Sequence, residues 1–157
     1  LIPVVLAAIL AFLTYLPHRR GQLMHWFQVE DNMYEVHFCI MWGLVIGLSW
    51  YLFNSYWYGL VPVLFMAFGD AVTGVVRNML YARRTKSWWG NLAMAATCIP
   101  LGGILLGVAG AVAGLAASLI EHFELNPVDD NILVPLTAFL VITAFSVAMP
   151  WAVTPIV

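Results

Sequence analysis

Charged residues are scarce in this chain: Asp, Glu, Lys and Arg make up 9% of its 157 residues, whereas 63% are hydrophobic. A soluble domain carries about 25% charged residues, so this composition excludes an ordinary soluble globule and a disordered chain. Six basic and eight acidic residues leave a formal charge of -2, which excludes a basic surface for nucleic acids. We therefore expect an all-α, polytopic integral membrane protein with no nucleic-acid partner.

Cysteine is also scarce. Cys39 and Cys98 both lie in apolar runs, which excludes a disulfide-stapled secreted scaffold and indicates buried thiols. The N-terminal apolar run lacks a basic start and a small-residue cleavage site, so it is not typical of a signal peptide. We expect residues 1–157 to form a single transmembrane catalytic domain, and the missing initial methionine leaves a longer N-terminus open.

Five apolar runs are long enough to suggest membrane-spanning helices, which need about 20 residues. The fourth run, residues 88–120, would reach about 50 Å as one helix, well beyond a hydrocarbon core of about 30 Å. Pro100, Gly102 and Gly103 near its middle predict a break, giving helices over 88–102 and 105–122. The prediction is a helical bundle of about six transmembrane helices, with the other runs at 1–16, 36–53, 56–76 and 131–149.

The placement of cations predicts the orientation of the chain. All six basic residues lie in two segments, at Arg19 and Arg20 and between Arg77 and Lys86, and positive residues favour cytoplasmic loops. With six helices, the acidic segment 121–130 returns to the same side. We expect a site facing the cytoplasm, in a prokaryotic plasma membrane or an endoplasmic-reticulum-type membrane. The spacing of apolar residues in 19–35 further predicts a helix lying along that interface.

Asp70 is the most informative residue, because an ionisable group inside an apolar helix is costly and is usually functional. Gly69 and Ala71 beside it remove side-chain bulk and would let a ligand approach the backbone. The alternative interpretation is a structural ion pair with Arg77, two helical turns later.

A basic segment follows, with Arg83, Arg84 and Lys86 directly before Ser87. Ser87 is placed to cap the next helix, and a helix N-terminus beside cations is suited to bind phosphate. Gly90 would allow close approach of that anion. The alternative interpretation is that the basic residues only set the membrane topology.

A third element is acidic. Asp129, Asp130 and Asn131 open an apolar run, and Glu121 precedes them at the end of another. Neighbouring oxygen ligands of this kind suit magnesium, with phosphates completing its coordination. A plain helix cap at Asp130 or Asn131 is the alternative. His37 opens the second apolar run on the same side of the membrane and is a weaker site candidate.

Three stretches resemble the dolichol kinase and phytol kinase family, the CTP-dependent polyprenol kinases related to membrane cytidylyltransferases. These stretches are Gly69-Asp70-Ala71, then Lys86-Ser87-Trp88-Trp89-Gly90, then Glu121 with Asp129-Asp130-Asn131-Ile132-Leu133-Val134-Pro135-Leu136. The chain departs from the family pattern at Arg77-Asn78, where the family has Gly-Arg, at Asn91, where it has serine, and at Met33-Tyr34, where it has Arg-Lys.

The resemblance implies a Mg²⁺-dependent membrane kinase that transfers the γ-phosphate of CTP to the hydroxyl of an isoprenoid alcohol. The alcohol would be of the dolichol, phytol or geranylgeraniol type, and ATP stays open as the donor. The implied catalytic and metal-binding residues are Asp70, Asp129 and Asp130, with Glu121 as a further metal ligand. Lys86, Arg83, Arg84, Ser87 and Gly90 would bind the nucleotide, and the supporting residues would be Asn131, His37 and Gly69.

Two other functions remain open at this point. A cytidylyltransferase acting on a lipid phosphate would release pyrophosphate instead of CDP. A non-enzymatic transporter would use Asp70 as a coupling site, although the charged residues gather in loops instead of at the membrane midplane. The sequence also leaves a homo-oligomer open.

Overall fold

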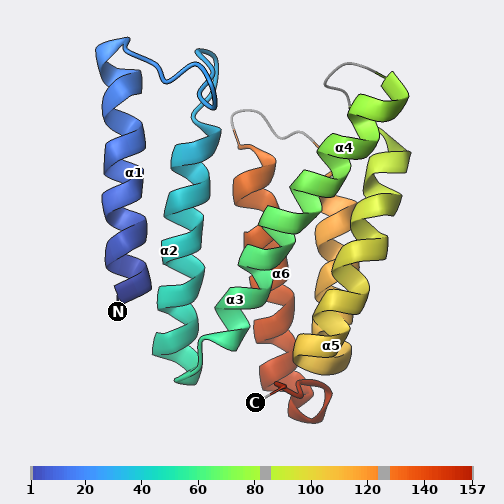
Figure 1. The fold of residues 1–157 in the computed structure, drawn as a ribbon. Coiled ribbons are helices and arrows are strands. Elements are labelled where there is room, and N and C mark those ends of the chain that lie inside the picture. Colours follow the sequence, from blue (N-terminus) through green and yellow to red (C-terminus); the bar gives the residue numbers. More distant parts are fainter. Residues whose placement is uncertain (1, 82–85, 124–127, 157) are drawn as a thin grey trace.

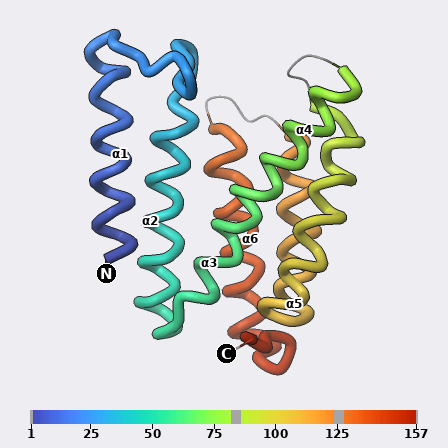
Figure 2. The backbone as a smooth tube through the Cα atoms, viewed as in Figure 1, coloured from blue at the N-terminus to red at the C-terminus, as the bar shows by residue number. Residues whose placement is uncertain are grey.

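The computed structural model describes residues 2–81, 86–123 and 128–156. Within these ranges the chain is all-α and contains no β-strand. Its elements form a helical bundle (Figures 1 and 2) and are, in chain order, α1 (Ile2–Arg20), α2 (Tyr34–Phe53), α3 (Trp57–Leu64), the π-helical turn η1 (Phe65–Gly69), α4 (Asp70–Tyr81), α5 (Trp88–Ile120), α6 (Asp130–Ala148) and the 3-10 turn η2 (Pro150–Ala152).

Five helical segments of the described chain are long and apolar enough to cross a membrane, which is compatible with an integral membrane protein. One of them combines α3, η1 and α4 into a continuous stretch from Trp57 to Tyr81. Pro62 in α3 has no N–H to donate, and the widened turn η1 begins three residues later, at Phe65. Such π turns often accompany functional sites, and this one ends immediately before Asp70.

Helix α5 reverses its direction near its middle. Leu106 and Gly107 have non-helical backbone angles, and Gly107 has a φ of +67°, which glycine adopts without steric cost. The two legs then pack against each other (Figure 1), and a Cβ on Gly114 would contact the backbone of Cys98. In a straight helix, residues 98 and 114 would lie about 24 Å apart, so the legs are antiparallel.

The expected reversal is present, but its predicted position is wrong. Pro100, Gly102 and Gly103 lie inside the first leg, and the turn comes at Leu106 and Gly107. Gly102 serves packing instead, because a Cβ there would overlap the carbonyl oxygen of Gly110 on the other leg. Whether the protein crosses the membrane six times stays a prediction.

The predicted interfacial helix over residues 19–35 is also wrong. Arg19 and Arg20 end α1, and residues 21–33 form turns. The buried side chain of Gln28 accepts a hydrogen bond from Met24 N (2.9 Å) and donates to Thr14 O (2.8 Å) and Glu35 Oε1 (2.7 Å). These side-chain hydrogen bonds satisfy backbone groups in a non-helical conformation, which competes with a helix.

The bundle has a polar end, where the segments that carry its described charged residues lie. The turns of residues 21–33, the end of α4, both ends of α5 and the start of α6 lie together at one end (Figure 1). The start of α1, the turn between α2 and α3, and η2 lie at the opposite end. Between them, a core of fully buried side chains joins α3, η1, α5 and α6; it includes Val61, Phe65, Met94, Leu106 and Ile142. This packing brings the three predicted segments to one end of the bundle.

Candidate functional site

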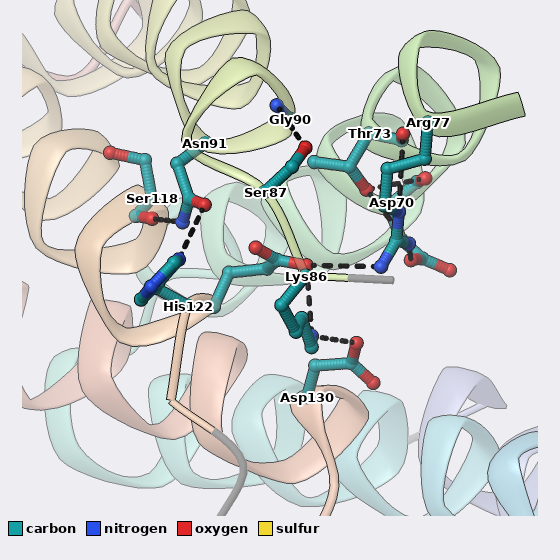
Figure 3. A network of polar contacts seen from close by, with 11 residues as sticks. Asp70, Thr73, Arg77, Lys86, Ser87, Gly90, Asn91, Ser118, His122 and Asp130 are labelled. Atoms are coloured by element: carbon teal, nitrogen blue, oxygen red, sulfur yellow. Dashed lines mark hydrogen bonds and ion pairs between the residues drawn. The ribbon is translucent and has the colours of Figure 1, made fainter. Parts of the chain in front are cut away.

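Lys86 connects two of the predicted segments (Figure 3). Its Nζ donates to Glu121 Oε1 at 2.9 Å and to Asp130 Oδ2 at 3.0 Å, joining the start of α5 to the end of α5 and the start of α6. Burial alone lowers the pKa of Lys86, but the charges of Asp130 and Glu121 and the hydrogen bonds to them outweigh it. The pKa of Lys86 is therefore raised, and the side chain stays an ammonium at neutral pH.

Arg77 connects the third segment to the same cluster. This buried guanidinium has Nη1 3.6 Å from Glu121 Oε1 and Nη2 3.7 Å from Asp70 Oδ1. Its Nε donates to Thr73 O at 3.3 Å, which holds the side chain along α4. The ion pair of Asp70 with Arg77, the structural alternative considered above, is thus present, and it forms part of a larger network.

The described network alternates charges in space. It runs from Asp70 through Arg77 to Glu121, and from there through Lys86 to Asp130 (Figure 3). Glu121 is the most buried of these carboxylates, with 3% of its side chain exposed, whereas 56% of the Asp70 side chain is exposed. Glu121 is therefore placed to organise the cations, and Asp70 is placed to meet a ligand.

Ser87 caps α5, as predicted. It is the N-cap residue, and its Oγ accepts a hydrogen bond from Gly90 N at 3.2 Å. Gly90 is buried, and a Cβ there would lie 3.6 Å from Thr73 Cβ and 3.7 Å from Arg77 Cγ. It therefore faces the packed contact with α4 instead of an open space for a nucleotide.

Gly69 also serves helix packing. A Cβ at this position would lie 2.7 Å from Met94 Cε and 3.2 Å from Cys98 Sγ, both on α5. The predicted reason for this glycine, approach of a ligand to the backbone, does not match its surroundings.

The adjacent aspartates point to different partners. Asp129 Oδ2 lies 2.8 Å from His37 Nδ1 of α2, and Asp129 Oδ1 is buried without a hydrogen-bond partner among the described residues. The N-cap residue of α6 is Asp129, and its side chain makes no capping bond; the alternative of a plain cap at Asp130 or Asn131 is therefore wrong, because both residues lie inside the first turn of α6. Asn131 Nδ2 donates to Tyr34 O at 3.3 Å, a second link between α6 and α2.

The four carboxylates predicted to bind a metal do not form one cluster. In the described part of the chain, no group of three or more His, Cys, Asp or Glu residues is close enough to hold a metal ion. Asp129 is paired with His37, and Glu121 is surrounded by Lys86 and Arg77. Arg83 and Arg84 lie outside the described residues.

Two cavities adjoin this network. A small one of about 10 Å³ lies among Asp70, Glu121 and Asp130, with apolar walls from Met66, Met94 and Val134, and is about the size of one water molecule. A larger one of about 410 Å³ lies between the starts of α2 and α6 and one face of α4; it is lined by Tyr34, Asp70, Gly74, Arg77, Asn78, Asp130 and Asn131.

Several residues around the site were missed by sequence reasoning. Tyr34 and Asn78 line the larger cavity, and Gly74 opens it. Asn91 links the two legs of α5, because its Nδ2 donates to Ser118 O at 2.6 Å and its Oδ1 lies 3.1 Å from His122 Nδ1. Arg77 could be recognised from the sequence, since it is a lone cation inside an apolar helix. The contacts of Asn91 could not, because they form only after α5 reverses its direction.

Comparison with known proteins identifies no relative: no family model, no curated protein and no solved structure matches the chain.

Proposed function

We propose that this protein is a membrane kinase that transfers the γ-phosphate of CTP to the hydroxyl of an isoprenoid alcohol. The observation that supports it best is the cavity of about 410 Å³, which Asp70, Asp130 and Arg77 line together. Phosphoryl transfer needs cations for the phosphate charge and a carboxylate that orients the attacking hydroxyl. The proposal also rests on the resemblance of the three motif stretches to polyprenol kinases.

In this proposal the hydroxyl oxygen attacks the γ-phosphorus of CTP. A new P–O bond to the lipid forms, the bond from the γ-phosphorus to the bridging oxygen breaks, and CDP leaves with that electron pair. The hydroxyl proton passes to Asp70 or Asp130, whichever carboxylate accepts the hydrogen bond of the alcohol. Lys86 and Arg77 stabilise the negative charge on the phosphates.

Mg²⁺ fits the residues that line the cavity. Magnesium in nucleotide sites is usually held by one or two carboxylates, with phosphate oxygens and waters completing the octahedron. Either Asp70 or Asp130 would supply a carboxylate to the ion, because both line the cavity, and the other would accept the hydroxyl proton. When bound, the ion would neutralise phosphate charge. Asp129 is better suited to orient His37, and Glu121 to hold Lys86.

The proposed orientation has six crossings, with the site at the cytoplasmic face. It is supported by Arg19 and Arg20, which end α1 at the same end of the bundle as the site. Single cysteines at Asn32 and Phe123 should react with a membrane-impermeant reagent from one side, and a cysteine at Trp151 from the other. Labelling of Phe123 and Trp151 positions from the same side would contradict the orientation.

The reaction is tested with purified protein, Mg²⁺, geranylgeraniol and CTP labelled at the α- or the γ-phosphate. We expect label in the lipid from γ-labelled CTP only, with CDP as the other product. Asp70→Asn should abolish transfer, whereas Asp31→Asn, at an exposed carboxylate in the turns of residues 21–33, should retain it. With geranylgeranyl phosphate as acceptor, label from α-labelled CTP and release of pyrophosphate would indicate a cytidylyltransferase instead. No label from either nucleotide would refute both enzymatic functions.

A further inference from the structure

The larger cavity separates α2 from α4 at the polar end of the bundle. Helix α2 packs on α1, α3 and α6, whereas α4 packs on α5 and η1. Figure 1 shows α4 leaning away from α2 toward this end, with α6 behind the opening. Tyr34 on α2 and Gly74 on α4 line the cavity from opposite sides, and Asp130 and Asn131 of α6 line it between them.

Asp70 lies at the level of the end of α5 and the start of α6, because it lines the small cavity together with Glu121 and Asp130. Helix α4 continues from there to Tyr81. A carboxylate at membrane depth faces a polar cavity or a binding partner, because contact with hydrocarbon is too costly. The neighbouring Phe68 and Val75 are exposed hydrophobic residues, 53% and 59% respectively. The polar cavity therefore adjoins a surface suited to lipid.

Gly74 leaves space on the α4 wall of the cavity because it has no side chain, and the fold does not require glycine at this position. A Cβ at this position would meet no atom within 4 Å, and the residue has no positive φ. Gly69 and Gly90 differ in this respect, because a Cβ at either would contact side chains of a neighbouring helix. The missing side chain at Gly74 thus serves neither packing nor backbone conformation, and it widens the cavity one turn from Asp70.

We propose that the acceptor alcohol enters sideways from the bilayer, between α2 and α4, and that Gly74 determines which acceptors fit. This inference rests on the proposed function. The chain of a lipid alcohol would pass Gly74 while its tail remains among lipids beside α4. Its hydroxyl would then lie next to Asp70, at the depth where the cavity is polar.

A binding measurement tests the route without relying on catalysis. A nitroxide spin label is attached to Asn78→Cys, which lines the same cavity one turn from Gly74, in phosphatidylcholine vesicles, with Val75→Cys as the matched control on the exposed side of α4. Native Cys39 and Cys98 are 8% and 0% exposed, so they should remain unlabelled. Added geranylgeraniol should immobilise the label at position 78 and leave position 75 unchanged. Equal changes at both positions, or none at position 78, would overturn the proposal.

Substitutions that fill the cavity test the specificity. Gly74→Phe should raise the KM for membrane-bound geranylgeraniol about tenfold and leave the KM for CTP unchanged, because it displaces the lipid chain and not the phosphates. Val75→Phe should change neither constant. A higher KM for CTP in Gly74→Phe, or an unchanged KM for the alcohol, would refute the role of Gly74. Immobilisation of the label at position 78 by geranylgeraniol, without phosphoryl transfer by the wild type, would instead refute the proposed function and leave the route intact.

Discussion

The replacement of Lys86 by methionine gives the sharpest test of the charge network. Methionine keeps a long apolar stem but removes the ammonium, and with it the 2.9 Å contact to Glu121 and the 3.0 Å contact to Asp130. Glu121, with 3% of its side chain exposed, then keeps its longer contact to Arg77, at 3.6 Å. Glu121 and Asp130, which both contact the Lys86 ammonium in the wild type, would then face each other without this cation between them.

The magnitude follows from burial. Removing one partner of a buried ion pair costs about 3–5 kcal/mol, because the remaining charge is left without compensation. Arg77 still attracts Glu121, and Asp130 is less buried, with 12% of its side chain exposed, so it can recover some hydration. We therefore expect Lys86→Met to lower the free energy of unfolding by about 3 kcal/mol, at the lower end of that range.

Unfolding by sodium dodecyl sulfate in detergent micelles, followed by circular dichroism, measures this difference. Lys86→Arg is the matched control, since it keeps the charge and should cost less than about 1 kcal/mol. Adding Glu121→Gln to Lys86→Met removes the uncompensated charge, so the double variant should be more stable than the sum of the single effects, by about 2 kcal/mol. A Lys86→Met protein within about 0.5 kcal/mol of wild type, with additive effects in the double variant, would refute this account.

Three further predictions concern pH, packing and catalysis. The pKa of Lys86 is raised above its ordinary value of 10.5, so the charged ammonium stabilises the folded protein fully below that pH. This stabilisation is lost as the pH rises through the higher folded-state pKa. The difference in unfolding free energy between wild type and Lys86→Met should therefore be constant from pH 7 to 9 and shrink at pH 11. Gly102→Ala should lower the unfolding free energy by about 1–3 kcal/mol, because its Cβ would overlap the opposite leg of α5. Gly103→Ala should not lower it, because its Cβ would lie 3.7 Å from the nearest side chain, and equal losses in the two variants would contradict the packing of the two legs. In steady-state assays, Lys86→Ala should mainly raise the KM for CTP and Asp130→Ala should mainly lower kcat. In the proposed reaction Lys86 would contact phosphate already in the ground state, whereas Asp130 would act as the hydroxyl attacks the γ-phosphorus; the opposite division would contradict these roles.

Part of the site was predictable from local patterns. Ser87 directly precedes an apolar run, and a serine in that position caps a helix through a local hydrogen bond that needs no tertiary contact. The ionisable Asp70 inside an apolar helix indicated a polar environment, because a carboxylate is too costly to bury in hydrocarbon. The length of residues 88–120 required a reversal, although the turn formed where Gly107 could take a positive φ and not at Pro100.

The partners of the charged residues were not predictable from those patterns. Asp129 and Asp130 are neighbours in sequence, yet one contacts His37 and the other Lys86, because the first turn of α6 lies between α2 and the start of α5. Arg77 became part of the site only because the second leg of α5 brings Glu121 back beside α4.

Composition and hydrophobic length by themselves determined that the chain is helical and suited to a membrane, and they located the segments that carry charge. Both properties depend on each stretch and its solvent alone, so no tertiary contact is needed to read them. Tertiary structure decided which carboxylate meets which cation, where α5 turns, and that Gly74 faces an open cavity. These features depend on contacts between residues far apart in the chain, such as Lys86 with Asp130, and side-chain packing selects those contacts from many that the sequence allows.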